Sequence, residues 1–186
     1  MLMLHNSPQE SNKMNIPAQN KTKNTGFTIV ELLIVIVIIG ILAAITVVAY
    51  NGIQNRANDT AIQSDVRNIF MKVRELEAIN GSIPAAAVAS GITGIGKIAV
   101  SKNAYWTANY NLYYCTGTIA GTNAFGVGAM SKSGNKFIYT SVAGPSAYTG
   151  EWTTSGSICP GMGFTSGYAH GYGFDVNSQT WNSWIQ

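Results

Sequence analysis

Residues 27 to 49 form an almost unbroken apolar run of Ile, Val, Leu and Ala, in which Glu31 is the only charged residue. About 20 such residues are needed to cross the hydrocarbon core of a membrane. Within lipid the backbone must satisfy its own hydrogen bonds, and a helix does so. The pattern therefore predicts a membrane-spanning helix over residues 27–50.

After residue 51 the pattern changes to apolar residues that recur three and four positions apart. This spacing is typical of one buried helix face, here formed by Ile62, Val66, Ile69, Val73 and Leu76. Charged residues, among them Asp59 and Asp65, fill the other positions. We expect an amphipathic continuation of the helix over residues 51–80 that packs on a globular domain, with a partner-binding heptad as the alternative. Asn80-Gly81 gives a C-terminal stop, and Gly52 is the favoured place for a kink or a melted turn.

Residues 81–186 are rich in Gly, Ser, Thr, Asn and Tyr, and turn residues separate short strand-like runs. We expect strands at residues 97–100, 110–114, 125–130, 136–142 and 171–176. The interval 85–96 is expected to be a loop or a short helix. The predicted fold class is α+β, with a long N-terminal α-helix packed on a small antiparallel β-sheet head.

Residues 1–26 are polar and irregular, and we expect them to be a cytoplasmic leader that is removed on maturation. Lys21 and Lys23 precede the apolar run, and no comparable basic cluster follows it directly, which places the N-terminus in the cytoplasm. Eight basic and seven acidic side chains follow residue 26, so that part of the chain is near neutral. Its charge does not indicate a nucleic-acid partner.

Glu31 lies inside the predicted span, where a charge costs about 2.5–3.5 kcal/mol on insertion scales, so it is expected to be functional. The run Gly26-Phe27-Thr28-Ile29-Val30-Glu31-Leu32-Leu33-Ile34-Val35 resembles the processing site of type IV prepilins and pseudopilins. The resemblance implies that a membrane peptidase cuts after Gly26 and methylates the new N-terminal Phe27. It also implies that Glu31 guides assembly by pairing with the Phe27 amine of a neighbouring subunit.

A secretory signal or a plain signal-anchor helix is the alternative interpretation of this segment. The apolar block from residue 32 to 49 is longer than the roughly 7–15 residues of a secretory h-region. A signal anchor would leave Glu31 without an explanation other than a glutamate tolerated near the membrane interface.

Two cysteines, Cys115 and Cys159, lie in the part of the chain that this topology exports, where oxidation is possible. We expect them to form a disulfide, because two cysteines leave a single intramolecular pairing. A loop of this length corresponds to at most roughly 4 kcal/mol on the chain-entropy estimate. Two separate buried thiols are the alternative.

The chain offers little chemistry for catalysis. His170 is the only histidine after residue 26, and we expect it at the surface or in a turn. Asp175 and Asn177 alternate as calcium ligands do, but the glycine and the final acid of a calcium loop are missing, so a turn is preferred. We expect no enzyme activity, no cofactor and no metal.

Aromatic residues are dense near the C-terminus, and we expect core and cross-strand pairs rather than a sugar-binding face: Tyr148, Trp152, Phe164, Tyr168, Tyr172, Phe174, Trp181 and Trp184. Four lysines among the loops are expected to be solubilising rather than a DNA-binding patch: Lys97, Lys102, Lys132 and Lys136.

The resemblance thus implies a structural subunit of a type IV pilus-like filament that polymerises with its own copies. The expected partners are the prepilin peptidase, an assembly platform and its ATPase, and the cytoplasmic membrane; nucleic acid is not expected. We expect a single pass through the cytoplasmic membrane with the N-terminus inside, followed by an extracellular filament. The alternatives are a pseudopilin of a type II secretion system, and a minor pilin or anchored binding protein for DNA or surfaces.

Overall fold

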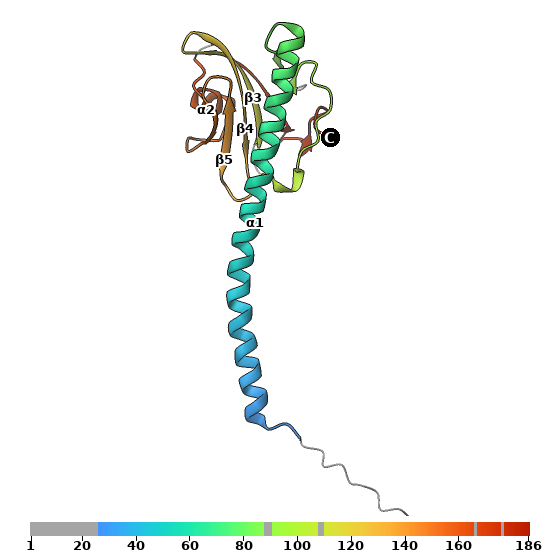
Figure 1. Cartoon of the computed structure of the whole chain (residues 1–186), viewed down its shortest axis with the longest axis vertical. Coiled ribbons are helices and arrows are strands. Elements are labelled where there is room, and N and C mark those ends of the chain that lie inside the picture. The colour runs from blue at the N-terminus through green and yellow to red at the C-terminus, as the bar shows by residue number, and fades with distance from the viewer. Residues whose placement is uncertain (1–25, 88–90, 108–109, 166, 176) are drawn as a thin grey trace, which may run out of the picture. The chain divides into compact units, whose positions relative to one another are not determined.

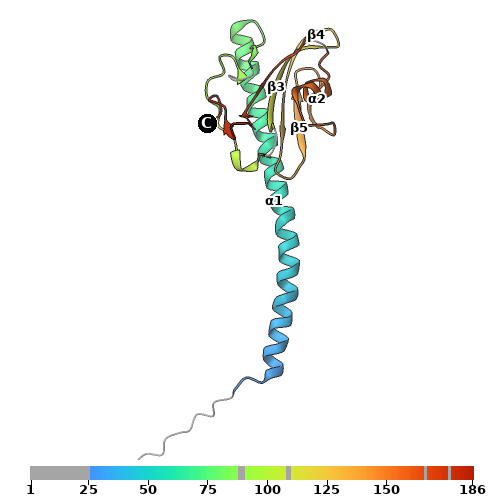
Figure 2. The same cartoon turned by 180° about the vertical axis from the view of Figure 1, so that it is seen from behind.

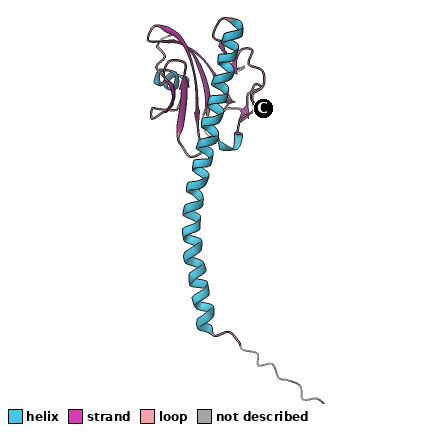
Figure 3. Ribbon diagram, in the orientation of Figure 1, coloured by secondary structure: helices cyan, strands magenta, loops and turns pink. Residues whose placement is uncertain are grey.

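The computed structural model describes residues 26–87, 91–107, 110–165, 167–175 and 177–186. By its contacts the chain divides into two units, one ending at Ala43 and the other spanning Ala44–Gln186. One long helix is followed along the chain by a β-rich region (Figures 1 and 3). The predicted α+β class is confirmed. The leader predicted over residues 1–26 lies outside the described residues, apart from Gly26.

The long helix, α1, spans Ile29–Asn80. Its Ile, Val and Leu side chains up to Ile53 are exposed. The helix is unbroken at Gly52, so the melted turn favoured there is wrong. It ends where the sequence predicts, because Gly81 takes the left-handed conformation, with φ 71°, and donates its N–H to the carbonyl oxygen of Glu77 at 2.9 Å.

Five antiparallel strands form the main sheet in the order β6-β5-β4-β3-β7. Their bounds are Leu112–Ile119 for β3, Thr122–Met130 for β4, Lys136–Thr140 for β5, Gly144–Ala147 for β6 and Ala169–Tyr172 for β7. Two short pairs accompany it, β1 (Ala86–Ala87) with β2 (Gly91–Ile92) and β8 (Phe174–Asp175) with β9 (Thr180–Trp181). A two-residue turn with positive φ at Ala120 and Gly121 joins β3 to β4, as hairpin geometry favours.

One face of the sheet is covered by the amphipathic part of α1, as the opposite views of Figures 1 and 2 show. The predicted stripe is confirmed, with Phe70 added to it and Leu76 only partly buried. Phe70 stacks on Tyr139 of β5 with ring centroids 3.8 Å apart. The helix packs on alternate strand residues, because successive strand side chains point to opposite faces: Leu112, Tyr114, Phe125, Val127 and Ala129.

The other face of the sheet is covered by the short helix α2 (Ser155–Gly161) and its flanking loops. Trp152 and Met162 lie directly on β4, because Gly126 and Gly128 have no side chains to keep them away. A Cβ at residue 128 would overlap Met162 and come within 2.9 Å of Trp152. These glycines therefore set how closely the second layer approaches the sheet.

The C-terminal residues complete the core on the α1 side. Trp184 and Ile185 are buried, and Ile185 pairs with Ile98 in a parallel bridge. The Trp184 indole N–H donates to the carbonyl oxygen of Tyr172 at 3.1 Å. Gly91, with φ 68°, lies against the same indole, where a Cβ would overlap the ring.

Four of the five predicted strands are found, with different bounds, and the fifth is not. The strand expected at residues 97–100 is wrong, because that segment has only the Ile98 bridge and ends in the 3-10 helix η1 (Lys102–Ala104). Strand β3 begins at Leu112 and runs to Ile119, beyond the expected 110–114. The segment 171–176 divides between β7 and β8 around Gly173, and residue 176 lies outside the described residues. Neither β6 nor α2 was predicted.

Asp59 and Asp65, which the sequence pattern places among solvent-facing positions, instead accept hydrogen bonds from the sheet domain. Asp59 accepts from the Ser133 hydroxyl at 2.5 Å and the Asn135 amide at 2.7 Å. Asp65, only 7% exposed, accepts from the backbone N–H of Ser101 at 2.7 Å. The two carboxylates bind different loops, so they fix the rotation and register of α1 on the sheet.

Asp59→Asn and Asp65→Asn are expected to change the pH dependence of stability in opposite directions. Burial alone would raise the pKa of Asp59, but hydrogen bonds from Ser131, Ser133 and Asn135 outweigh it and lower that pKa below 3.8. Its stabilisation is therefore present above pH 3.8 and is lost as the pH falls through the lower folded value. Asp59→Asn should lower the free energy of unfolding by about 1 kcal/mol at neutral pH, after discounting for exposure, and should match the wild type in acid.

Burial raises the pKa of Asp65 above 3.8, against the opposing hydrogen bonds from Ser101. Its contribution to stability is therefore full below pH 3.8 and declines as the pH rises through the folded value. Asp65→Asn should be at least as stable as the wild type at neutral pH and should lose that advantage in acid. Denaturant unfolding of the purified chain in detergent, repeated from neutral to acid pH, measures both; parallel curves for the two variants would contradict the assignment.

Replacing both Cys115 and Cys159 by Ala is expected to lower the free energy of unfolding by about 2–5 kcal/mol, because the bond closes a loop of 44 residues. The measurement is denaturant unfolding of the oxidised wild type, the reduced wild type and the double variant. The reduced protein and the variant should agree closely, and a variant as stable as the oxidised protein would contradict this prediction.

Candidate functional site

The segment that carries the predicted processing site precedes the first turn of α1. Gly26 has no heavy atom within 4 Å of the position that a Cβ would occupy, and the Phe27 side chain is 90% exposed. Neither residue belongs to a helix or strand. The peptide bond between them therefore lies in an open, non-helical segment, which is the form of backbone that a protease binds.

Thr28 and Glu31 form a reciprocal cap on the first turn of α1. The Glu31 carboxylate accepts the backbone N–H and the hydroxyl of Thr28, both at 2.8 Å. In return the Glu31 N–H donates to the Thr28 hydroxyl oxygen at 3.2 Å. This is a capping box, in which Thr28 is the N-cap residue and Glu31 the third helical residue.

The capping box explains how the chain orients its one carboxylate in the apolar run. The positive end of the helix dipole favours a negative charge in the first turn. The two bonds from Thr28 hold that charge beside the backbone N–H of Thr28, which is one residue away from Phe27. Sequence reasoning missed Thr28, although the Thr-x-x-Glu spacing at residues 28–31 was a visible signal.

Residues 21–47 match the family model of the prokaryotic N-terminal methylation motif. No solved structure matches the chain. The matched segment contains Gly26, Phe27, Thr28 and Glu31, so the chain carries the signature of type IV pilin-like prepilins. These are structural subunits of a pilin type, not enzymes.

Helix α1 also contains the only stretch among the described residues that is long and apolar enough to cross a membrane, judged by length and composition. It begins three residues after Gly26. The apolar helix and the methylation motif together fit a membrane-anchored pilin.

The predicted disulfide between Cys115 and Cys159 is confirmed, and it joins β3 to α2 across the second core. It lies in the sheet domain and is a structural bond rather than part of the N-terminal site. Both sulfur atoms belong to fully buried residues.

The remaining candidates do not form a catalytic centre in the structure. His170 lies in β7, paired in register with Cys115, and burial lowers its pKa. Asp175 accepts the backbone N–H of Asn177 at 2.9 Å, which forms the turn preferred from the sequence. Among the described residues no three His, Cys, Asp or Glu side chains come together as metal ligands would.

The C-terminal aromatic residues are core residues, as expected. Trp152, Phe164, Phe174 and Trp184 are buried, and the other four pack against the two cores. Lys102 lies over the Trp181 ring at 5.8 Å and Lys136 donates to the carbonyl oxygen of Gly150, so these two lysines make contacts within the head.

Thr28→Val is expected to loosen the first turn of α1, because it removes the hydroxyl that caps the Glu31 N–H. Loss of an N-cap hydroxyl costs about 0.5–2 kcal/mol. Hydrogen exchange of the Glu31 amide in detergent micelles should therefore accelerate by roughly threefold to thirtyfold. Thr28→Ser is the control, since it keeps the hydroxyl; equal acceleration in both variants would contradict the capping role.

Proposed function

We propose that this chain is a structural subunit of a type IV pilus-like filament that is cut after Gly26 and methylated on Phe27. Residues 27–50 hold the processed subunit in the cytoplasmic membrane and then pack among its copies in the filament core. The observation that carries the proposal is the methylation motif over residues 21–47, joined to an exposed apolar helix that starts at Ile29.

The proposal assigns two successive roles to Glu31. In the uncut chain its carboxylate caps its own helix through Thr28. Cleavage creates a positive amine on Phe27, and the carboxylate of a neighbouring subunit pairs with it. Because both charges leave water, the pair offsets a large desolvation cost, and its main effect is to fix the register between neighbours.

The proposed domain organisation follows from these roles. Residues 1–26 are the leader, 27–50 the membrane and filament-core helix, 51–80 its amphipathic continuation and 81–186 the head. The N-terminus starts in the cytoplasm and the head lies outside, where the Cys115–Cys159 bond can form. The partners are copies of the same chain, the prepilin peptidase, an assembly platform and its ATPase.

Mass spectrometry of sheared fibres and of membranes from the source cells tests this function. The wild-type fibre subunit should begin at a methylated Phe27. Gly26→Leu should retain the leader and yield no fibres, because the side chain blocks close approach of the peptidase to the backbone. A chain that still begins at Met1 in every fraction would contradict the proposal.

Glu31→Gln separates processing from assembly. The variant should be cut normally but should yield on the order of tenfold fewer fibres or less, because breaking an ion pair that excludes water leaves an unpaired charge. Glu75→Gln is the matched control, since Glu75 is an exposed α1 glutamate whose only described ion pair is a surface contact with Lys72. The measurement is the amount of the Phe27 form in the sheared fraction relative to the membrane fraction.

A further inference from the structure

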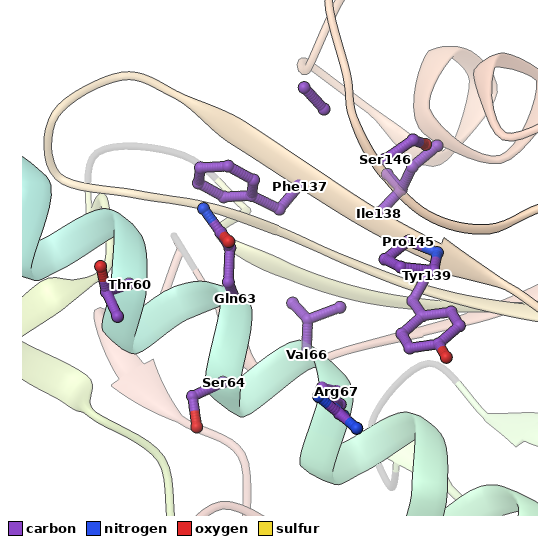
Figure 4. A pocket seen from close by; sticks show the side chains of 11 residues that line it. Thr60, Gln63, Ser64, Val66, Arg67, Phe137, Ile138, Tyr139, Pro145 and Ser146 are labelled. Atoms are coloured by element: carbon purple, nitrogen blue, oxygen red, sulfur yellow. The ribbon is translucent and has the colours of Figure 1, made fainter.

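A groove of about 750 Å³ lies between α1 and the β5–β6 edge of the sheet. The helix contributes Gln63, Val66 and Arg67 to its lining, and β5 contributes Phe137 and Tyr139. Figure 4 shows Gln63 and Val66 extending from α1 toward these strand side chains. Strand β6 is the edge of the sheet, so the groove lies beside backbone that has no further strand to pair with.

Arg67 is the only charged residue in the lining of this groove. It is exposed, and its guanidinium makes no ion pair or hydrogen bond with any described side chain. Arg74, two turns further along α1, differs: it pairs with Glu77 at 2.8 Å and lies over the Phe70 and Phe125 rings. The groove therefore presents one uncompensated positive charge between partly apolar walls.

Six of the seven carboxylates after residue 26 are engaged within the chain. The engaged carboxylates and their partners are Glu31 with Thr28, Asp59 with Ser133 and Asn135, Asp65 with Ser101, Glu75 with Lys72, Glu77 with Arg74, and Asp175 with the Asn177 N–H. Glu151 is the exception. It is exposed, and its carboxylate has no hydrogen-bond or ion-pair partner in the described part of the chain.

Glu151 lies in the loop between β6 and α2, whereas Arg67 lies on α1. The residue after Glu151, Trp152, is buried in the core on the α2 side, whereas the groove is bordered by α1. The loop that carries Glu151 is held in place, because Lys136 donates to the carbonyl oxygen of Gly150 at 2.8 Å and Trp152 donates to that of Tyr110 at 2.6 Å. No ion pair joins Glu151 to Arg67 among the described residues, so the carboxylate and the groove guanidinium do not meet within one molecule.

We propose that Glu151 of one subunit binds Arg67 in the groove of a second copy of the chain. This contact rests on the proposed filament function. A contact between two different patches is heterologous, so it can repeat from copy to copy, and it generates an open helical assembly where the rotation between copies does not close a ring. A carboxylate and a guanidinium can form two parallel hydrogen bonds, and the apolar walls strengthen their attraction relative to open water.

Repetition matters because a single exposed ion pair contributes little to stability. In a filament each subunit would make the contact twice, once through its groove and once through its Glu151 loop. Reversing one charge places like charges together at every such contact, and like-charge contacts are strongly unfavourable. Reversing the charges of both Arg67 and Glu151 restores attraction at each contact between subunits.

Charge reversal in the source cells tests the pairing. Arg67→Glu and Glu151→Arg should each reduce the sheared-fibre fraction by about tenfold or more, since like charges then face each other. The double variant should recover to within about twofold of the wild type, because the pair is restored in the opposite sense. Glu75→Arg is the control for a reversal on exposed α1 outside the groove, and equal membrane levels with an intact disulfide check folding.

Cross-linking tests the contact directly. Arg67→Cys combined with Glu151→Cys supplies the only reactive thiols, because both native cysteines are bonded to each other. A short bismaleimide added to fibres should give a ladder of dimers and higher multimers. Glu75→Cys with Glu151→Cys is the control and should remain monomeric, because residue 75 lies roughly 12 Å further along the helix.

Each outcome decides the proposal. Rescue by the double reversal together with the ladder supports it. Single reversals that assemble normally, a double reversal that fails to recover, or a missing ladder in intact wild-type-like fibres would overturn the contact while leaving the filament function in place. Absence of fibres from the wild type itself would overturn the filament function and, with it, this contact.

Discussion

The sheet domain depends on one apolar layer. In it, five side chains of α1 are buried against facing side chains of β3, β4 and β5. The sheet presents Leu112, Tyr114, Phe125 and Val127 on the face that α1 covers, and α2 packs on the opposite face. Burial of an apolar side chain contributes roughly 1.5–3 kcal/mol, so this layer supplies much of the stability of the domain. Strand order, loop positions and the second core are arranged around it.

Polar contacts then determine how the apolar layer is aligned. Hydrophobic packing is non-directional, and a helix could slide or rotate on a sheet with modest loss. Asp59 and Asp65 remove that freedom, because each binds backbone or side-chain donors of a different loop. On the other face, Gly126 and Gly128 with the Cys115–Cys159 bond set the position of α2. Hydrogen bonds thus align the helix on one face of the sheet, and glycines with a disulfide align the helix on the other.

Periodicity in the sequence was sufficient for the helix and insufficient for the head. The stripe from Ile62 to Leu76 and the stop at Gly81 follow from local rules, and both are correct. The segment 97–100 was misjudged because its partner, Ile185, is 87 positions away and forms only one bridge. Helix α2 was missed because Ser, Gly and Pro dominate it; the Ser157 hydroxyl and tertiary packing hold it rather than propensity.

The N-terminal motif was readable because its residues are contiguous, whereas the groove combines residues from α1, β5 and β6 that no local pattern connects.

Trp184 and Ile185 lie in the core beneath the hairpin at Gly91, and they pair with residues near position 98. The chain must therefore be synthesised as far as Ile185 before its core on the α1 side can close. Until then the apolar face of the sheet and the buried face of α1 are incomplete, and exposed surfaces of this kind associate with one another in nascent chains. Residues 184 and 185 therefore take part in the step that completes the core on the α1 side.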